Sequence, residues 1–303
     1  MGHVSDIFRL TYKSIRFVGI TLGYVVLWSL LSILFVVWFG WGIKGYFIGF
    51  CLGGILVALM GCWTIREYLD LSVWHIQWWP TLLKFGSPLV LSGVGMYALN
   101  TTDRWFILKY HGQHELGIYA IGAKFVILLL FAVNAFRGAW LAMGNEALHS
   151  EDGPELYRLV SKYYLGLTII GVIIITALSP FLLKVFSSKP YHGAYPLVGI
   201  LSWYAVFYGL FTIFCGGIWK KKKTLWSSFA MIAAAVLNIV LDWCLVPRFG
   251  GMGAAVATAI SFFFWNVITL ILSERLWMVR YPLKTLGFQM TVGVILCWVI
   301  LFI

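Results

Sequence analysis

Charged side chains are scarce in this chain of 303 residues, and acidic ones are the scarcest. Only 11% of the residues are charged, and Asp and Glu together number 11. Soluble domains average about 25% charged residues, so the sequence lacks the polar surface that a water-soluble fold needs. Since 61% of the residues are hydrophobic, lipid is the expected solvent. The sequence therefore predicts an all-α polytopic membrane protein.

The usual patterns of enzyme and metal sites are missing too. The five cysteines fall in or beside apolar runs without the spacing of metal ligands. No Ser/His/Asp set, carboxylate pair or phosphate-binding glycine loop stands out. We therefore expect no enzyme, no catalytic residue, no metal and no cofactor. The net charge of +11 comes from basic residues spread between apolar segments, which favours membrane lipids over nucleic acid as partners.

Long apolar runs make up most of the chain. A helix needs about 20 apolar residues to cross the hydrocarbon core of a bilayer. The runs are continuous rather than alternating, which favours helices over a strand barrel. The sequence predicts about nine transmembrane helices, at 17–39, 43–63, 81–103, 117–141, 163–186, 195–218, 225–246, 252–273 and 284–303.

The basic residues between these runs set an orientation. With a cytoplasmic N-terminus, most of the 22 Lys and Arg residues fall on the inner side, including Arg9, Lys13 and the Lys220–Lys223 run. Membrane proteins place such an excess of positive charge in the cytoplasm. We therefore predict an N-terminus inside the cell.

Two outer turns share a glycine pattern. The turn between the seventh and eighth spans contains Pro247, which is expected to stop a helix, followed by Gly250 and Gly253. The turn between the first two spans contains Gly42 and Gly45 at the same spacing. Aligning the two pairs predicts a parallel internal repeat, as in two-lobed transporters.

The sequence also resembles a known family. The stretch Asn238–Thr258 has the form Asn-x-x-x-Asp, Val-Pro-x-x-Gly-x-x-Gly-Ala-Ala-x-Ala-Thr. It is similar to the matching hairpin of bacterial polysaccharide flippases of the MATE-like superfamily, the exporters of O-antigen, capsule and exopolysaccharide units. The stretches Leu83–Pro88, Asp103-Arg104 and Leu116–Ala120 resemble the start of the C-terminal lobe of that family.

The resemblance implies a domain arrangement. Residues 1–79 correspond to the last hairpin of the N-terminal lobe with a cytoplasmic linker. Residues 80–275 correspond to a complete six-helix C-terminal lobe, and residues 276–303 to an additional C-terminal span. The first four spans of the family have no counterpart, so we expect either a fragment or a chain that needs a partner.

The resemblance also implies a function in the bacterial inner membrane. The expected substrate is an undecaprenyl-pyrophosphate-linked oligosaccharide, flipped to the outer leaflet for synthesis of surface polysaccharide. A polysaccharide polymerase and chain-length machinery are implied partners. Two alternatives stay open, a multidrug or cation antiporter of the same superfamily and a membrane-embedded polysaccharide polymerase or ligase.

Polar residues inside the spans are the candidate functional groups, because they are costly in lipid. Lys124 and Arg137, with Asn134 one turn from Arg137, are expected to line a cavity for an anionic substrate, although Arg137 could instead snorkel to the cytoplasm. Asp242 and Asn238 share a helix face and are candidates for a coupling ion or for a structural contact, including a pair with Arg248. Asp103 is expected to pair with Lys124.

Overall fold

The computed structural model describes residues 14–64, 66 and 78–302, and the regular structure in these ranges is helical. The chain divides into two compact units, Met1–Trp79 and Pro80–Ile303. The basic residues Arg9 and Lys13, which the orientation argument uses, lie outside the described residues. Each unit is considered by itself.

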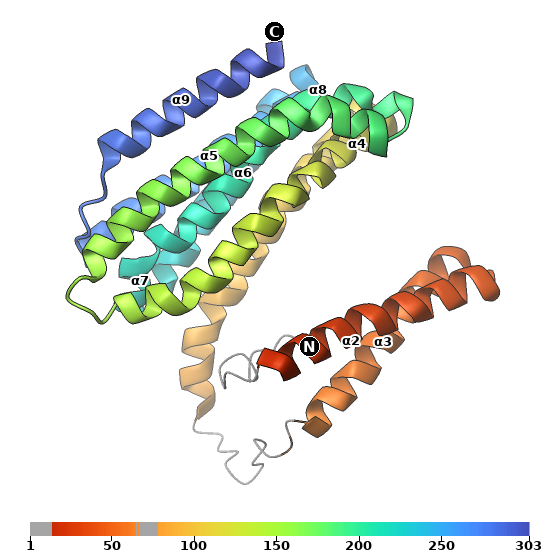
Figure 1. Ribbon diagram of the computed structural model, residues 1–303, viewed down its shortest axis with the longest axis horizontal. Helices are drawn as coiled ribbons and strands as arrows, with labels where there is room; N and C mark the ends of the chain where they lie inside the picture. Colours follow the sequence, from red (N-terminus) through yellow and green to blue (C-terminus); the bar gives the residue numbers. More distant parts are fainter. Residues whose placement is uncertain (1–13, 65, 67–77, 303) are drawn as a thin grey trace. The chain divides into compact units, whose positions relative to one another are not determined.

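The first unit is a helical hairpin. Helix α2 (Ser14–Ile33) continues into a short π-helix, η1 (Leu34–Trp38), and the chain returns as α3 (Gly42–Thr64). Figure 1 shows α2 and α3 lying side by side. The turn between them uses Gly40 and Gly42, whose φ angles of 65° and 53° suit glycine because it has no Cβ.

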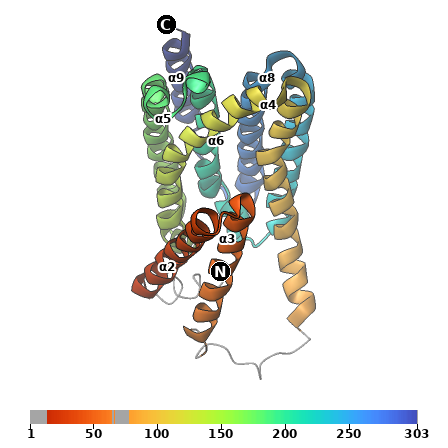
Figure 2. The same ribbon diagram turned by 90° about the vertical axis from the view of Figure 1, so that its right-hand side faces the viewer.

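The second unit is a bundle built from long helices and short connections. Figure 2 shows it from the side, with α5, α6, α8 and α9 standing close to parallel. Its elements are α4 (Trp79–Ala147), α5 (Gly153–Phe186), the 3-10 helix η5 (Lys189–Ala194), α6 (Tyr195–Phe214), α7 (Gly216–Lys220), α8 (Thr224–Leu276) and α9 (Leu283–Phe302).

Two of these helices fold back on themselves. Helix α4 has 69 residues and α8 has 53, so each is far longer than the roughly 20 residues that cross a bilayer. The backbone leaves helical geometry at Gly112 (φ 81°) in α4 and at Gly250 (φ 54°) in α8. Figures 1 and 2 both show the two arms of α4 running in opposite directions from a bend. Each helix can therefore cross the membrane twice.

The helices agree with the predicted spans. Seven helices among the described residues are long and apolar enough to cross a membrane, and two of them are α4 and α8 with two arms each. Every predicted span falls in one of these helices or arms. The prediction of an all-α polytopic membrane fold is confirmed.

Two details of the predicted turns are wrong. The sequence predicts a loop at 104–116, but α4 stays helical up to its bend at Gly112, because little in that stretch besides this glycine opposes a helix. Pro247 is expected to end a helix, yet α8 continues through it for one more turn. The chain turns at Gly250 instead, because glycine adopts the positive φ of 54° that the bend requires.

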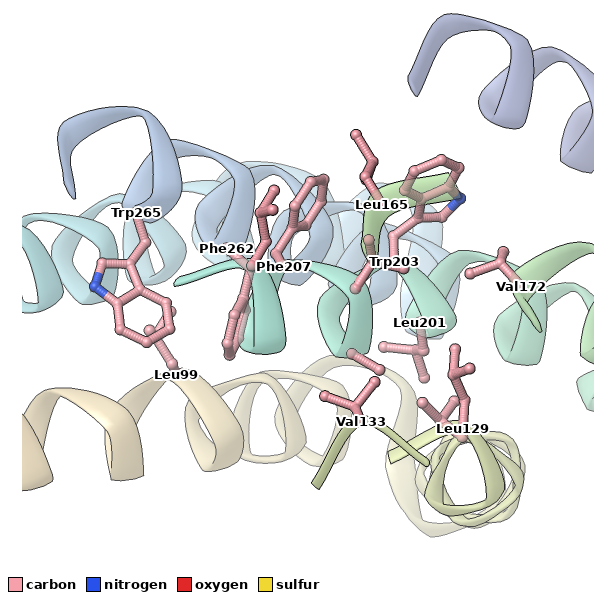
Figure 3. Packing of buried hydrophobic residues seen from close by; sticks show 14 of the residues in the cluster. Leu99, Leu129, Val133, Leu165, Val172, Leu201, Trp203, Phe207, Phe262 and Trp265 are labelled. Atoms are coloured by element: carbon pink, nitrogen blue, oxygen red, sulfur yellow. The ribbon is translucent and has the colours of Figure 1, made fainter. Parts of the chain in front are cut away.

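Helix α6 forms the centre of the second unit. Its residues Leu201, Trp203 and Phe207 lie between the arms of α4, helix α5 and the second arm of α8, as Figure 3 shows. The α6 sequence is apolar all round, which is the pattern of a helix surrounded by others. In the most apolar part of the span Lys189–Lys220, which contains α6, 78% of the residues are buried. This is the largest buried share of any span in the described residues. The polar residues that face this helix are therefore held in a dry interior.

Candidate functional site

Three polar side chains from the two arms of α8 are buried together. Asn238 and Asp242 lie one turn apart on the first arm and have no exposed surface. Thr258 lies on the second arm, beyond the bend at Gly250, and is 5% exposed. The shared face of Asn238 and Asp242, which their spacing predicts, is thus turned into the bundle.

Two of these three side chains have no hydrogen-bond partner among the described residues. Both carboxyl oxygens of Asp242 and both polar atoms of the Asn238 amide are buried and unpaired. The buried hydroxyl of Thr258 faces the hydroxyl of Tyr119. A buried polar group without a hydrogen-bond partner destabilises the folded state by several kcal/mol. The predicted contact between Asp242 and Arg248 is not formed, so nothing in the described chain offsets the cost of this acid.

Asp103 adds a second buried acid from the first arm of α4. It is 3% exposed and accepts hydrogen bonds from the hydroxyl of Tyr119, on the second arm of α4, and from the backbone N–H of Arg104 at 2.7 Å. The predicted ion pair with Lys124 is not present, and Arg158–Glu155 is the ion pair found in the described residues. Asp103 contacts Tyr119 and not Lys124, because Tyr119 lies about one turn nearer to the bend at Gly112 and is fully buried.

The bends of α4 and α8 bring these groups together. The ring nitrogen Nε2 of His111 lies 2.8 Å from the carbonyl oxygen of Val246, and the N–H of Gly251 donates to Glu115 Oε1 at 3.1 Å. Asp103 and Tyr119 of α4 line the same cavity as Thr258 of α8. The result is one buried cluster with two carboxyls, one amide and two hydroxyls, which we call the acid cluster (Asp103, Tyr119, Asn238, Asp242 and Thr258).

A cavity of about 260 Å³ opens onto the acid cluster. Asp103, Tyr119 and Thr258 form its buried part, while the exposed residues Arg104 and Lys124 line its mouth. The cavity therefore has negative or neutral oxygens at its base and positive charge at its mouth. An oxygen-lined base of this kind suits a small cation, and the mouth suits an anion.

Arg137 lies on the same arm of α4 as Lys124, about 20 Å further along the helix by rise per residue. Its Nη1 donates a long bond of 3.4 Å to Oδ1 of Asn134, which lies one turn away along the helix. Its guanidinium carbon lies 3.8 Å from the ring centre of Tyr208, on α6. Its Nε is buried and has no acceptor among the described residues. The guanidinium thus retains unused donors within the bundle.

Three residues of the site were not selected from the sequence. Thr258 and Tyr119 lie within the motifs that carry the family resemblance, so the motifs point to these two residues but not to the side chains that they meet. Tyr208 gave no such signal, because it meets Arg137 across two helices that are distant in sequence. A second and larger groove, of about 820 Å³ beside α9, has an almost wholly apolar lining and holds none of the predicted site residues.

Comparison with known proteins agrees with this fold. The MatE family pattern matches residues 88–244, more than half of the chain. The probable multidrug resistance protein NorM of Geobacillus kaustophilus is 25% identical over 199 residues, which are 61% of this chain and 43% of that protein. Lsg locus putative protein 1 of Haemophilus influenzae is 33% identical over 67 residues, which are 22% of this chain and 17% of that protein.

A solved structure extends the likeness over nearly the whole chain. The inward closed conformation of the lipid II flippase MurJ superposes with a TM-score of 0.66 at 18% sequence identity. The match covers 91% of this chain and 59% of MurJ. This chain therefore spans less than half the length of the NorM and Lsg relatives that it matches. Its fold is that of MurJ and its relatives, and the chain belongs to the MatE family.

Proposed function

We propose that this chain is part of a transporter that moves an anionic, lipid-linked oligosaccharide across the bacterial inner membrane. The substrate would be an undecaprenyl-pyrophosphate-linked repeat unit, carried from the cytoplasmic to the outer leaflet and passed to a polymerase with its chain-length machinery. The N-terminus of the chain would lie in the cytoplasm. The likeness to MurJ, which is a lipid II flippase, supports this class of cargo.

The observation that carries the proposal is the cavity with Arg104 and Lys124 at its mouth and Asp103, Tyr119 and Thr258 of the acid cluster at its base. Arg104 and Lys124 provide positive charge where an anionic head group would enter. Arg137, with Asn134, provides further unused donors on the same arm of α4. Such side chains would lower the free energy of a pyrophosphate that has left water.

The acid cluster is the proposed binding site for the coupling ion. A carboxyl that is dry and unpaired, like that of Asp242, is stable only when a proton or a metal cation neutralises it. The amide of Asn238 and the hydroxyl of Thr258 supply two more oxygens for such an ion. Binding and release of Na⁺ or a proton there would bias the bundle between its inward-facing and outward-facing states.

Transport by purified protein in liposomes tests the proposal. A fluorescent undecaprenyl-pyrophosphate disaccharide is added to the inner leaflet, and its arrival outside is followed by lectin capture. Arg137→Ala should lower the rate at least tenfold while the protein remains in the membrane. Arg158→Ala, which removes an exposed arginine at the start of α5, is the matched control. Normal transport by Arg137→Ala would show that this arginine only snorkels.

A multidrug or cation antiporter is the second candidate. It is favoured by the likeness to NorM, which is described as a probable multidrug resistance protein. An antiporter for cationic drugs would use its acids to bind the drug and would not need the cations at the cavity mouth. Efflux of ethidium that depends on Asp242 but not on Arg137, without any lipid transport, would favour this alternative.

A further inference from the structure

We infer that Tyr208 is a positioning residue that holds the guanidinium of Arg137 toward the interior of the bundle for contact with the pyrophosphate of the substrate. The inference rests on the proposed function, which gives Arg137 its anionic ligand. It adds a residue from α6 to a set of candidate substrate contacts whose cations, Arg104, Lys124 and Arg137, all come from α4. It also replaces the alternative in which Arg137 extends toward the cytoplasm.

The position of the ring is the first argument. The guanidinium carbon of Arg137 lies 3.8 Å from the centre of the Tyr208 ring, which is van der Waals contact with the ring face. Among the cation–ring contacts in the described part of the chain, this one is the shortest. An arginine that reaches for the interface would lie away from such a ring, whereas the guanidinium carbon of this one lies over a ring of α6, the helix at the centre of the unit.

The unused donors are the second argument. Guanidinium carries five N–H donors, and stacking on a ring face leaves them free around its edge. One of them reaches Asn134 Oδ1 at 3.4 Å, and Nε has no acceptor in the described residues. A ring face therefore fixes the plane of the guanidinium without consuming the bonds that a pyrophosphate would accept. A carboxylate partner would have consumed them.

Neighbouring contacts join the helices that carry Arg137 and Tyr208. Phe136, beside Arg137 on α4, packs on Tyr164 of α5 with ring centres 4.5 Å apart, and the Tyr164 hydroxyl donates to the carbonyl oxygen of Val206 on α6 at 3.1 Å. These contacts tie α4 and α5 to the turn of α6 that carries Tyr208. The stack is thus built into the packing of three helices.

Two variants separate the ring from its hydroxyl. Tyr208→Phe keeps the ring face, and Tyr208→Leu removes it. Binding of undecaprenyl pyrophosphate to the detergent-solubilised chain should be unchanged in Tyr208→Phe and at least fivefold weaker in Tyr208→Leu. The double variant with Arg137→Gln should bind no worse than Arg137→Gln alone, because both changes remove one interaction. Additive losses would overturn the inference.

The matched control is Tyr163→Leu. Tyr163 is an exposed tyrosine on α5, and the Nζ of Lys162 lies 5.8 Å from its ring centre. It therefore has a cation over its ring but no place in the site. Its removal should leave binding of undecaprenyl pyrophosphate at the wild-type level, and a loss equal to that of Tyr208→Leu would contradict a specific role for Tyr208.

A measurement without ligand separates this inference from the proposed function. Phenylglyoxal modifies accessible guanidinium groups, and mass spectrometry gives the rate at Arg137. The rate should rise at least threefold in Tyr208→Leu and stay unchanged in Tyr208→Phe. An unchanged rate in Tyr208→Leu overturns the inference. If wild-type protein fails to bind undecaprenyl pyrophosphate while the rate still rises, the proposed substrate is wrong and the positioning role stands.

Discussion

Two hairpins in this chain turn on the same pair of glycines. Gly42 and Gly250 have φ angles of 53° and 54°. Three residues later, Gly45 and Gly253 each lie against the backbone of the preceding helix, where an added Cβ would come within 2.9 Å of Phe35 or 2.6 Å of Leu245. The shared geometry supports the predicted internal repeat, because each glycine of a pair performs the same task in both hairpins.

The side chains that the two hairpins carry are different. Aligned on their glycines, Asn238, Asp242 and Thr258 of α8 correspond to Leu30, Leu34 and Phe50 of the first hairpin. The α8 residues are at most 5% exposed, and their apolar counterparts are at least 38% exposed. The same turn thus serves as plain scaffold in one hairpin and carries buried polar chemistry in the other. The two hairpins thus differ in their buried polar side chains and not in the glycines of their turns.

The largest expected effect on transport comes from giving the α8 hairpin a residue of the first hairpin. Asp242→Leu installs the residue of the first hairpin, and transport in liposomes should fall by at least tenfold. The variant should also be more stable toward heat by roughly 1–3 kcal/mol, because an unpaired buried acid is replaced by an apolar side chain. Leu34→Ala should leave transport unchanged. A variant at position 242 that still transports would remove the coupling role from the acid cluster.

The next largest effect is expected at the second glycine of each turn, Gly45 and Gly253, which approach a neighbouring backbone closely. Gly253→Ala should destabilise the protein by about 2–3 kcal/mol and Gly45→Ala by about 1–2 kcal/mol, because both meet backbone and the approach at Gly253 is closer. Steric trapping in bicelles measures the free energy of unfolding. Equal or reversed costs would mean that the two hairpins are packed differently from this description.

The first glycine of each turn should also resist substitution. An L-residue with φ near +53° costs about 1–2 kcal/mol, so Gly42→Ala should lose about that amount in the same unfolding assay. Gly250→Ala should lose more, because an added Cβ there comes within 3.1 Å of Glu115 Oε1, whereas Gly42 has open space around it. The exposed helical Gly19 has open space around it, so Gly19→Ala serves as the control and should be neutral or slightly stabilising. A smaller loss at Gly250 than at Gly42 would contradict this description of the two turns.

The smallest expected effect concerns the outer edge of the acid cluster. Tyr119→Phe removes the hydroxyl that donates a hydrogen bond to Asp103. The net contribution of such a bond to stability is about 1 kcal/mol. The concentration of cation needed for half-maximal transport should change severalfold, with the maximal rate retained. Tyr110→Phe, an exposed tyrosine on the same arm as Asp103, provides the comparison and should show no change.

The sequence was sufficient for the helices and insufficient for the pairing of side chains. Apolar length located every span, and glycine spacing located the turns, because both depend on local chemistry. The positions of the bends were missed by a few residues, since a helix continues through Pro247 when only one donor is lost. The partners of Asp103 and Arg137 depend on which helices meet, and no local pattern shows that Tyr119 or Tyr208 would lie opposite them.

The central claim, that the α8 hairpin binds a cation at Asp242, is tested most directly by thermal unfolding of the purified chain in detergent. Melting temperatures are compared in NaCl, KCl and choline chloride and between pH 5 and pH 8, for wild type and Asp242→Leu. A ligand that binds only the folded state raises the melting temperature. The account predicts a rise with Na⁺, K⁺ or acid in wild type that is absent in Asp242→Leu. An equal response in both proteins, or none in wild type, would contradict it.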